Sequence, residues 1–232
     1  MEDHYVAPEI RGNKMIKIYL VRHCESEGNK HRIFQGQHDA DISEKGAGQL
    51  EFLAKRFKDI KLDKIYASRL TRAYKTAKAV ADAKGMNVEI DNDFIEINLG
   101  EMDGKPWDYI FDNNPDLKQA WYHEPYKFAP PGGETMKQVY ERAGAGFEKI
   151  ISNPENEDKT ILIVTHGCCL RNLLCYIIFG DIKRLGEVKG AANTAVTLLL
   201  CDDDGVKVDY MCDYSHLPAQ YVSSIKKVYT EE

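Results

Sequence analysis

The stretch MIKIYLVRHCESEGN (15–29) begins as an apolar run and turns to charged residues at Arg22 and His23. Its β-branched and aromatic residues predict a strand over 15–21. Arg22 and His23 are costly to bury, so at the end of such a strand they either reach solvent or bind an anion. The rest of the sequence has to decide between these two interpretations.

Strand and helix patterns alternate along the rest of the chain. Ser43 is expected to cap a helix that runs to about Lys58, and Ser68 a second helix that ends at Gly85. This alternation predicts an α/β fold, a three-layer αβα sandwich whose mostly parallel sheet has an antiparallel edge. Further helices are expected over 134–152 and 167–179, and strands over 64–68, 87–90, 160–166 and the hairpin pair 194–200 and 206–211.

The composition describes an ordinary globular chain of 232 residues, with no repeat and no linker. We therefore expect a single domain over 1–232, with an aromatic-rich insertion at about 104–133. The net charge of −6 argues against nucleic acid or an anionic membrane as a partner. No apolar stretch is long enough to span a bilayer, and residues 1–14 lack the apolar region of a secretory signal.

Cysteine and histidine spacings favour neither disulfides nor metal binding. The six cysteines include no CxxC pair, and the seven histidines no HExxH motif. We interpret the cysteines as reduced core residues of a cytoplasmic protein, and we expect no metal site.

Polar residues follow several of the predicted strands. Ser68 and Arg72 come after the second strand, Glu96 after the third, and His166 after TILIVT. Taken singly, each fits a solvated strand cap, an exposed helix residue or a tight turn. In open α/β sheets, however, ligands bind at the carboxyl ends of the strands. The joint occurrence of these residues favours one anion site at that edge.

The ordered motifs RHCESEGN, QG (35–36), SRLTRA, IEINLGEMDG, PPGGET and VTHG resemble those of the histidine phosphatase superfamily. The branch is the one that contains cofactor-dependent phosphoglycerate mutases, and the resemblance runs from about Met15 to beyond Asn193. It implies a phosphoglycerate mutase-like fold. The chain departs from the family at Cys24, where glycine is usual. This cysteine is either an inert small residue or, beside a positive pocket, an oxidisable thiol of lowered pKa.

The resemblance implies a phosphohistidine mechanism. His23 would be the nucleophile, and Glu96 would first protonate the leaving group and then draw a proton from water. Nearby arginines would keep the His23 imidazole neutral by lowering its pKa. The scheme uses no metal and no other cofactor. The implied catalytic residues are His23, Glu96 and His166, and the implied phosphate-binding residues are Arg22, Asn29, Gln35 and Arg72.

The acceptor of the phosphoryl group separates phosphatases from mutases. A mutase resembles a phosphatase with extra basic residues, including paired arginines in its insertion, but residues 73–141 contain no arginine. We therefore expect a phosphoric monoester hydrolase that acts on a small phosphorylated metabolite. One alternative is a cofactor-dependent phosphoglycerate mutase primed by 2,3-bisphosphoglycerate. The other is a non-catalytic anion-binding regulatory module, which the complete set of site residues disfavours. The oligomeric state stays open: the hydrophobic edge at 194–200 could pair in a homodimer or be covered.

The insertion is rich in aromatic residues. They could line a lid over the leaving group, or pack two short helices onto the sheet. We expect most of them to pack, and one or two to contact substrate. Glu134, in PPGGE, is either a first-turn helix residue or a ligand. The seven aromatic residues are Trp107, Tyr109, Phe111, Trp121, Tyr122, Tyr126 and Phe128.

Overall fold

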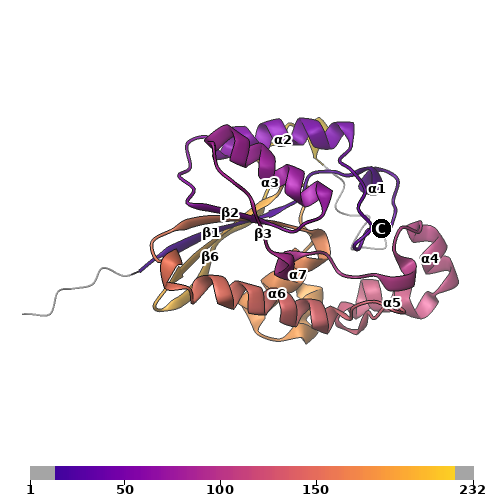
Figure 1. Ribbon diagram of the computed structural model, residues 1–232. Coiled ribbons are helices and arrows are strands. Elements are labelled where there is room, and N and C mark those ends of the chain that lie inside the picture. Colours follow the sequence, from indigo (N-terminus) through magenta and orange to yellow (C-terminus); the bar gives the residue numbers. More distant parts are fainter. Residues whose placement is uncertain (1–13, 223–232) are drawn as a thin grey trace, which may run out of the picture.

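The computed structural model describes residues 14–222, in which a six-stranded sheet lies between two layers of helices (Figure 1). β1 pairs in parallel with β4, β4 with β2, and β2 with β3, whereas β5 is antiparallel to β1 and to β6. The predicted α/β sheet with an antiparallel edge is confirmed. In spatial order the strands are β3 (Glu89–Ile90), β2 (Lys64–Ala67), β4 (Thr160–Thr165), β1 (Ile16–Arg22), β5 (Val196–Asp202) and β6 (Gly205–Asp213).

Helices cover both faces of β1, which explains why its sequence is apolar at nearly every position. Tyr19 and Val21 pack with α2 (Glu44–Phe57) and α3 (Thr71–Lys84) on one face of the sheet. Ile18 and Leu20 pack with α6 (Met136–Ile151) and α7 (Gly167–Phe179) on the other face. Successive side chains of a strand point to opposite faces, so a central strand between two helical layers needs apolar residues throughout.

Helix boundaries confirm some capping predictions and correct one. Ser43 caps α2 by accepting a hydrogen bond from Gly46 N, and Gly85 ends α3 with a left-handed φ of 64°. The prediction that Ser68 caps α3 is wrong. Ser68 N still donates to Val164 O of β4, so the chain is extended there, and Leu70 takes the N-cap position without a side-chain bond.

Two other predicted elements are shorter than expected. The predicted strand 87–90 is reduced to the two exposed residues of β3 at the sheet edge. The helix predicted from 134 begins at Met136, where Thr135 and Gln138 form a capping box. The prediction about a secretory signal concerns residues 1–14, and 1–13 of these lie outside the described residues.

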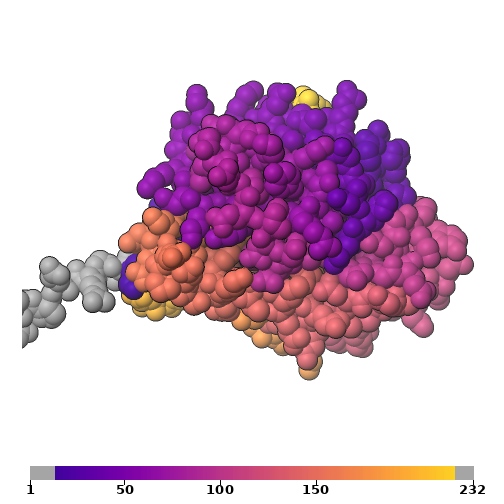
Figure 2. All heavy atoms as spheres, viewed as in Figure 1, coloured from indigo at the N-terminus to yellow at the C-terminus, as the bar shows by residue number. Residues whose placement is uncertain are grey.

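The insertion contains two short helices, α4 (Trp107–Asn113) and α5 (Pro115–His123), which lie beside α1 (Glu27–Lys30) at one end of the molecule (Figures 1 and 2). The Trp107 ring stacks on Phe34 at a centroid distance of 4.2 Å, and Trp121 and Phe128 are buried. Most of the aromatic residues therefore pack, as expected. The 3₁₀ helices are Asn92–Phe94, Gly100–Met102, Pro125–Lys127, Pro154–Asn156, Ile182–Glu187 and Ala219–Tyr221.

Within residues 14–222, no helix has the length and apolar character needed to cross a membrane.

Candidate active site

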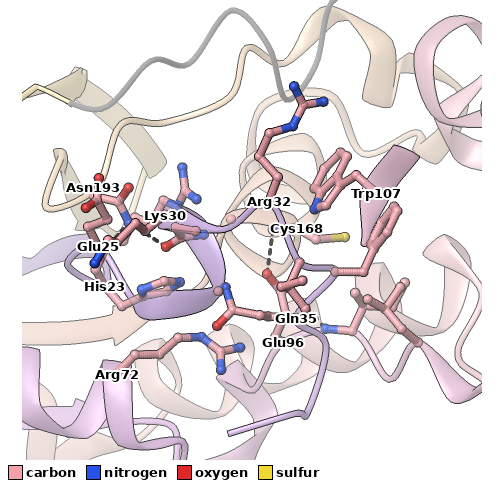
Figure 3. A pocket seen from close by; sticks show the side chains of 18 of the residues that line it. His23, Glu25, Lys30, Arg32, Gln35, Arg72, Glu96, Trp107, Cys168 and Asn193 are labelled. Carbon is pink, nitrogen blue, oxygen red and sulfur yellow. Dashed lines mark hydrogen bonds between the residues drawn. The ribbon is translucent and has the colours of Figure 1, made fainter. Parts of the chain in front are cut away.

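The carboxyl ends of the central parallel strands bring the predicted residues together. Arg22 ends β1 opposite Thr165 of β4, and His23 N donates to Thr165 O at 2.9 Å. The rings of His23 and His166 consequently lie 5.1 Å apart, centroid to centroid. A cavity of about 390 Å³ opens at this edge (Figure 3). Six of the seven predicted site residues line it: Arg22, His23, Asn29, Gln35, Arg72 and Glu96.

His23 is buried in the tautomer that a nucleophile requires. Its Nδ1 lies 2.6 Å from the carbonyl oxygen of Cys24. Because a carbonyl oxygen only accepts, Nδ1 carries the proton and Nε2 keeps its lone pair. Burial lowers the pKa of His23 well below its usual value, and the charges of Arg72 and Arg22 lower it further. The imidazole is therefore neutral at neutral pH, with burial contributing more than the arginines.

Backbone carbonyls anchor the two arginines of the site. Arg22 donates from one terminal nitrogen to Ala191 O at 2.6 Å. Arg72 donates to Gly36 O at 2.8 Å and to His38 O at 2.9 Å. In the described part of the chain, the buried Nε atoms of both arginines have no hydrogen-bond acceptor. Each guanidinium thus keeps an N–H donor in a buried position, which is a suitable arrangement for oxygen ligands.

Asp103 fixes the loop that holds Arg72. Its carboxylate accepts hydrogen bonds from Gly36 N, Gln37 N and His38 N at 2.7–2.9 Å. Gly36 packs so closely that a Cβ there would lie 2.4 Å from the Ile97 carbonyl oxygen. Sequence reasoning missed Asp103, although it lies within a quoted motif, because the backbone groups that it binds are 65–67 residues away along the chain.

Asn29 is held by a small hydrogen-bond network. Its Oδ1 accepts from Ser26 N at 3.2 Å and from Asn193 Nδ2 at 3.3 Å. Asn193 Nδ2 also donates to His23 O at 2.9 Å, so Asn193 links the nucleophile to Asn29. Gln35 Oε1 accepts from Ser26 Oγ at 3.0 Å. Sequence reasoning missed Asn193 as a site residue, because its bonds to this loop cross most of the chain.

The N-terminus of α7 holds the Glu96 carboxylate. Its oxygens accept from Cys168 N at 3.0 Å and Cys169 N at 2.9 Å, and the first of these bonds is drawn in Figure 3. Ile97 N donates to the same carboxylate at 3.0 Å. The first N–H groups of a helix have no partner within the helix, so they are available to orient carboxyl oxygens. Glu96 is therefore fixed at the wall of the cavity.

Glu134 is a structural residue of the loop before α6. It forms a paired ion contact with Arg142, both bonds at 3.0 Å, and accepts from Asn98 N. Arg142 also donates to the carbonyls of Asp93 and Ile95, next to Glu96. Neither of the two roles considered for Glu134 is correct: the residue precedes Thr135, the N-cap of α6, so it is not in the first turn, and it does not line the cavity.

His166 is fully buried beside His23, and it is not among the residues that line the cavity. Its Nε2 lies 2.5 Å from Ser68 Oγ, and Leu70 N donates to that same oxygen at 3.4 Å. The Ser68 proton can therefore be donated to Nε2, which leaves the ring proton on Nδ1. Nδ1 is buried without a partner among the described residues. Burial first, and Arg72 second, lower the pKa of His166 well below its usual value.

Cys24 has the properties of an inert residue. Burial raises the pKa of its thiol to about 11, and the residue does not line the cavity. Its backbone N donates to Thr76 Oγ1 at 3.0 Å. The alternative of a thiol with a lowered pKa is therefore wrong, because loss of solvent outweighs the nearby positive charge. Residues 14–222 contain no group of three or more His, Cys, Asp or Glu side chains placed to hold a metal ion.

The outer part of the cavity is apolar and aromatic. Two of the insertion's seven aromatic residues, Trp107 and Trp121, line it. Arg32 adds positive charge there, and Figure 3 shows it beside Trp107, whereas Lys30 lies near Glu25 and Asn193 on the side of His23. The remaining apolar lining consists of Ile33, Phe34, Ile97 and Leu99.

Comparison with known proteins agrees with this geometry. The model of the histidine phosphatase superfamily (branch 1) matches residues 18–214. Phosphoserine phosphatase 1 of Hydrogenobacter thermophilus is 31% identical over 217 residues, covering 92% of this chain and 100% of that protein. A protein of Erwinia tasmaniensis named "Probable phosphoglycerate mutase GpmB" is 32% identical over 164 residues, which cover 71% of this chain and 75% of that protein. The solved structure of Bacillus stearothermophilus YhfR superposes with a TM-score of 0.81 at 31% identity. The superposition covers 87% of this chain and 98% of that structure.

Proposed function

Because this chain belongs to the histidine phosphatase superfamily and is a phosphoric monoester hydrolase, we propose that it hydrolyses small phosphorylated metabolites through a phosphohistidine at His23. One observation carries the proposal. A neutral, buried His23 lies among buried N–H donors on Arg22, Arg72 and His166 that have no acceptor within residues 14–222. A phosphoryl group supplies oxygens for such donors, and neutralising those oxygens is what attack on a phosphate dianion requires.

In the first half-reaction, His23 Nε2 attacks phosphorus. The N–P bond forms, the bond from phosphorus to the ester oxygen breaks, and the Glu96 carboxyl gives its proton to the departing oxygen. In the second half-reaction, water attacks phosphorus and the N–P bond breaks. The Glu96 carboxylate takes a proton from this water, and inorganic phosphate leaves. Each half-reaction returns Glu96 to the state that the other one needs.

The remaining predicted residues bind the phosphoryl oxygens in this proposal. Arg22 and Arg72 donate from guanidinium groups that carbonyls already orient. Asn29 donates from its amide nitrogen, since its oxygen is engaged by Ser26 and Asn193. His166 does not line the cavity; its Nδ1 donates to a phosphoryl group attached to the His23 ring, whose centroid lies 5.1 Å from that of His166, and Gln35 contributes a further polar contact.

Water is the proposed acceptor, and the mutase alternative is weaker. The stretch 73–141 has no arginine, and none of its lysines lines the cavity. A mutase needs basic residues there to retain a phosphorylated acid. The relative from H. thermophilus is named a phosphoserine phosphatase, so phosphoserine is a first substrate to assay. We also propose a cytoplasmic location, which the six unpaired cysteines support.

Hydrolysis of p-nitrophenyl phosphate in the presence of a chelator, by wild type and by Arg72→Ala, tests the proposed function. We expect turnover by the wild type and a loss of at least about 10²-fold in kcat/KM for the variant, because Arg72 would neutralise developing charge. Glu101→Gln, an exposed change near the site, is the control. Turnover of 3-phosphoglycerate to its isomer without phosphate release would instead favour the mutase. Absence of both activities would favour the non-catalytic module.

A further inference from the structure

The segment that precedes β5 is bonded to the end of β1, where the nucleophile lies. Thr194 N donates to Arg22 O at 2.9 Å and to His23 O at 3.4 Å. Asn193 Nδ2 donates to the same His23 oxygen at 2.9 Å, and Figure 3 shows Asn193 and His23 at the same end of the cavity. Two successive residues thus hold the carbonyl group of His23. The backbone that carries the imidazole therefore depends on the conformation of Asn193 and Thr194.

Thr194 adopts a backbone conformation that threonine rarely takes. Its φ is +59°, in the left-handed region, where a branched side chain is crowded by the backbone. The residue is also fully buried. A β-branched residue stays in such a conformation only where the surrounding structure holds it there. The hydroxyl group of Thr194 makes one contact that can do so, with His216 in the segment after β6.

His216 is the donor in this contact, because an arginine decides which of its ring nitrogens carries the proton. Its Nδ1 lies 3.1 Å from a terminal nitrogen of Arg56. A guanidinium only donates, so Nδ1 accepts and Nε2 carries the proton. Nε2 then donates to Thr194 Oγ1 at 3.2 Å. Burial first, and Arg56 second, lower the pKa of His216 to about 4, so the ring is neutral at neutral pH.

Arg56, on α2, is anchored on its other sides by β6. It pairs with Asp213 Oδ2 at 2.7 Å and donates to the Tyr210 hydroxyl at 3.2 Å, and its side chain is only 14% exposed. The bonds therefore run without a break from α2 and β6 through His216 to Thr194. None of these side chains lines the cavity. The network can consequently act on the site only through the backbone at the end of β1.

We infer that His216 is a positioning residue, which holds Thr194 in its left-handed conformation and thereby fixes the backbone from which the His23 imidazole extends. The inference rests on the proposed phosphohistidine mechanism. A small displacement of a nucleophile from its line of attack lowers the rate of reaction strongly. The guanidinium groups of Arg22 and Arg72 are anchored by other carbonyls. Loss of the His216 contact should therefore slow the attack on phosphorus while phosphate binding changes little.

Two substitutions of His216 separate the hydrogen bond from the bulk of the ring. His216→Gln keeps an N–H donor that can reach Thr194, whereas His216→Leu has none. Rapid-quench kinetics with p-nitrophenyl phosphate measures the rate at which His23 is phosphorylated. We expect this rate to fall about 3–10-fold in His216→Leu, the factor that one hydrogen bond supplies, and to stay near that of the wild type in His216→Gln. The inhibition constant of inorganic phosphate should change by less than about twofold in both variants.

Thr194→Gly shows whether the effect passes through Thr194. Glycine suits the left-handed backbone but has no hydroxyl group, so adding His216→Leu to Thr194→Gly should not slow phosphorylation further. Ile150→Val is the control, since it removes buried apolar volume at the C-terminal end of α6 and lowers stability without touching this network. Its phosphorylation rate should equal that of the wild type. A wild-type rate in His216→Leu, or an undiminished effect of His216→Leu in the Thr194→Gly background, overturns the inference.

Hydrogen exchange of the Thr194 amide, measured without substrate, tests the contact independently of turnover. This amide donates to Arg22 O, so its protection should fall in His216→Leu and return in His216→Gln. Unchanged protection in His216→Leu overturns the inference. If protection falls as expected but the wild type forms no phosphohistidine, the proposed mechanism fails and the hold of His216 on Thr194 is supported.

Discussion

His23 Nδ1 lies 2.6 Å from the carbonyl oxygen of Cys24, and this contact decides which ring nitrogen is the nucleophile. The bond is made by backbone, so it does not depend on the side chain at position 24. This explains how the site accommodates cysteine where the family usually has glycine. Orientation of a catalytic imidazole through its second nitrogen is a general feature of histidine chemistry.

Replacing Glu96 by Gln should slow the hydrolysis of an ester more when its leaving group must be protonated to depart. We expect kcat for glycerol 3-phosphate to fall by about 10²–10⁴-fold, the usual range for loss of a general acid. The loss for p-nitrophenyl phosphate should be smaller, since p-nitrophenolate leaves without protonation. Steady-state kinetics on both esters measures the difference. Equal losses for the two esters would rule out Glu96 as the proton donor.

Replacing Asp103 by Asn should weaken phosphate binding, although Asp103 itself does not contact the substrate. Oδ1 accepts from Gly36 N, and Oδ2 from Gln37 N and His38 N; the NH₂ group that replaces one of these oxygens cannot accept, so at least one bond is lost and the loop that orients Arg72 loosens. These bonds are partly buried or exposed, so loss of one costs about 0.5–1.5 kcal/mol. We expect kcat/KM to fall by a similar factor for every ester, with weaker inhibition by vanadate. Asp112→Asn, on the exposed side of α4, serves as the control. Unchanged vanadate inhibition would contradict the positioning role.

Arg22, His23 and His166 were accessible to sequence reasoning because the ends of neighbouring parallel strands meet at one edge. Asp103 and Asn193 were not, because they act on backbone groups 67 and 170 residues away. No local pattern encodes such pairing. The wrong prediction for Ser68 has a similar origin: serine before a helix is a typical cap, but strand pairing extends through it. A single domain over 1–232 stays a prediction.

Stability should fall as the pH is lowered below neutral. The pKa values of buried His23 and His166 lie well below 6.5, and that of His216 is lowered to about 4, mainly by burial. Between these values and 6.5, the unfolded chain binds protons that the folded chain does not. The free energy of unfolding is therefore not reduced by these histidines above pH 6.5, and it decreases as the pH falls from 6.5 toward their folded-state pKa values.

Urea unfolding between pH 7.5 and pH 5 measures this dependence. His216→Gln should show a shallower decline than the wild type, because one of the depressed histidines is removed. Tyr109→Ala, an exposed change that removes no histidine, should decline like the wild type. A free energy of unfolding that does not change over this range would show that these histidines are not buried as described.

The folding stability of the protein should depend on Trp121 of the insertion and hardly on Tyr109. Trp121 is 5% exposed and packs against Phe34, Trp107 and Phe128, so Trp121→Ala should cost about 3–5 kcal/mol. Tyr109 is 57% exposed, and Tyr109→Ala should change stability by less than about 0.5 kcal/mol. Chemical denaturation of both variants tests the packing. A similar cost for the two would mean that the aromatic residues of the insertion do not form a core.

Rapid quenching of the enzyme with substrate under alkaline conditions, followed by peptide mass spectrometry, tests the central claim most directly. Phosphohistidine survives alkali, so the peptide that contains His23 should carry one phosphoryl group in the wild type. Glu96→Gln should accumulate this species if breakdown becomes limiting, and His23→Ala should lack both the modification and turnover. Hydrolysis that persists in His23→Ala, or a phosphoryl group found on another residue, would contradict the mechanism.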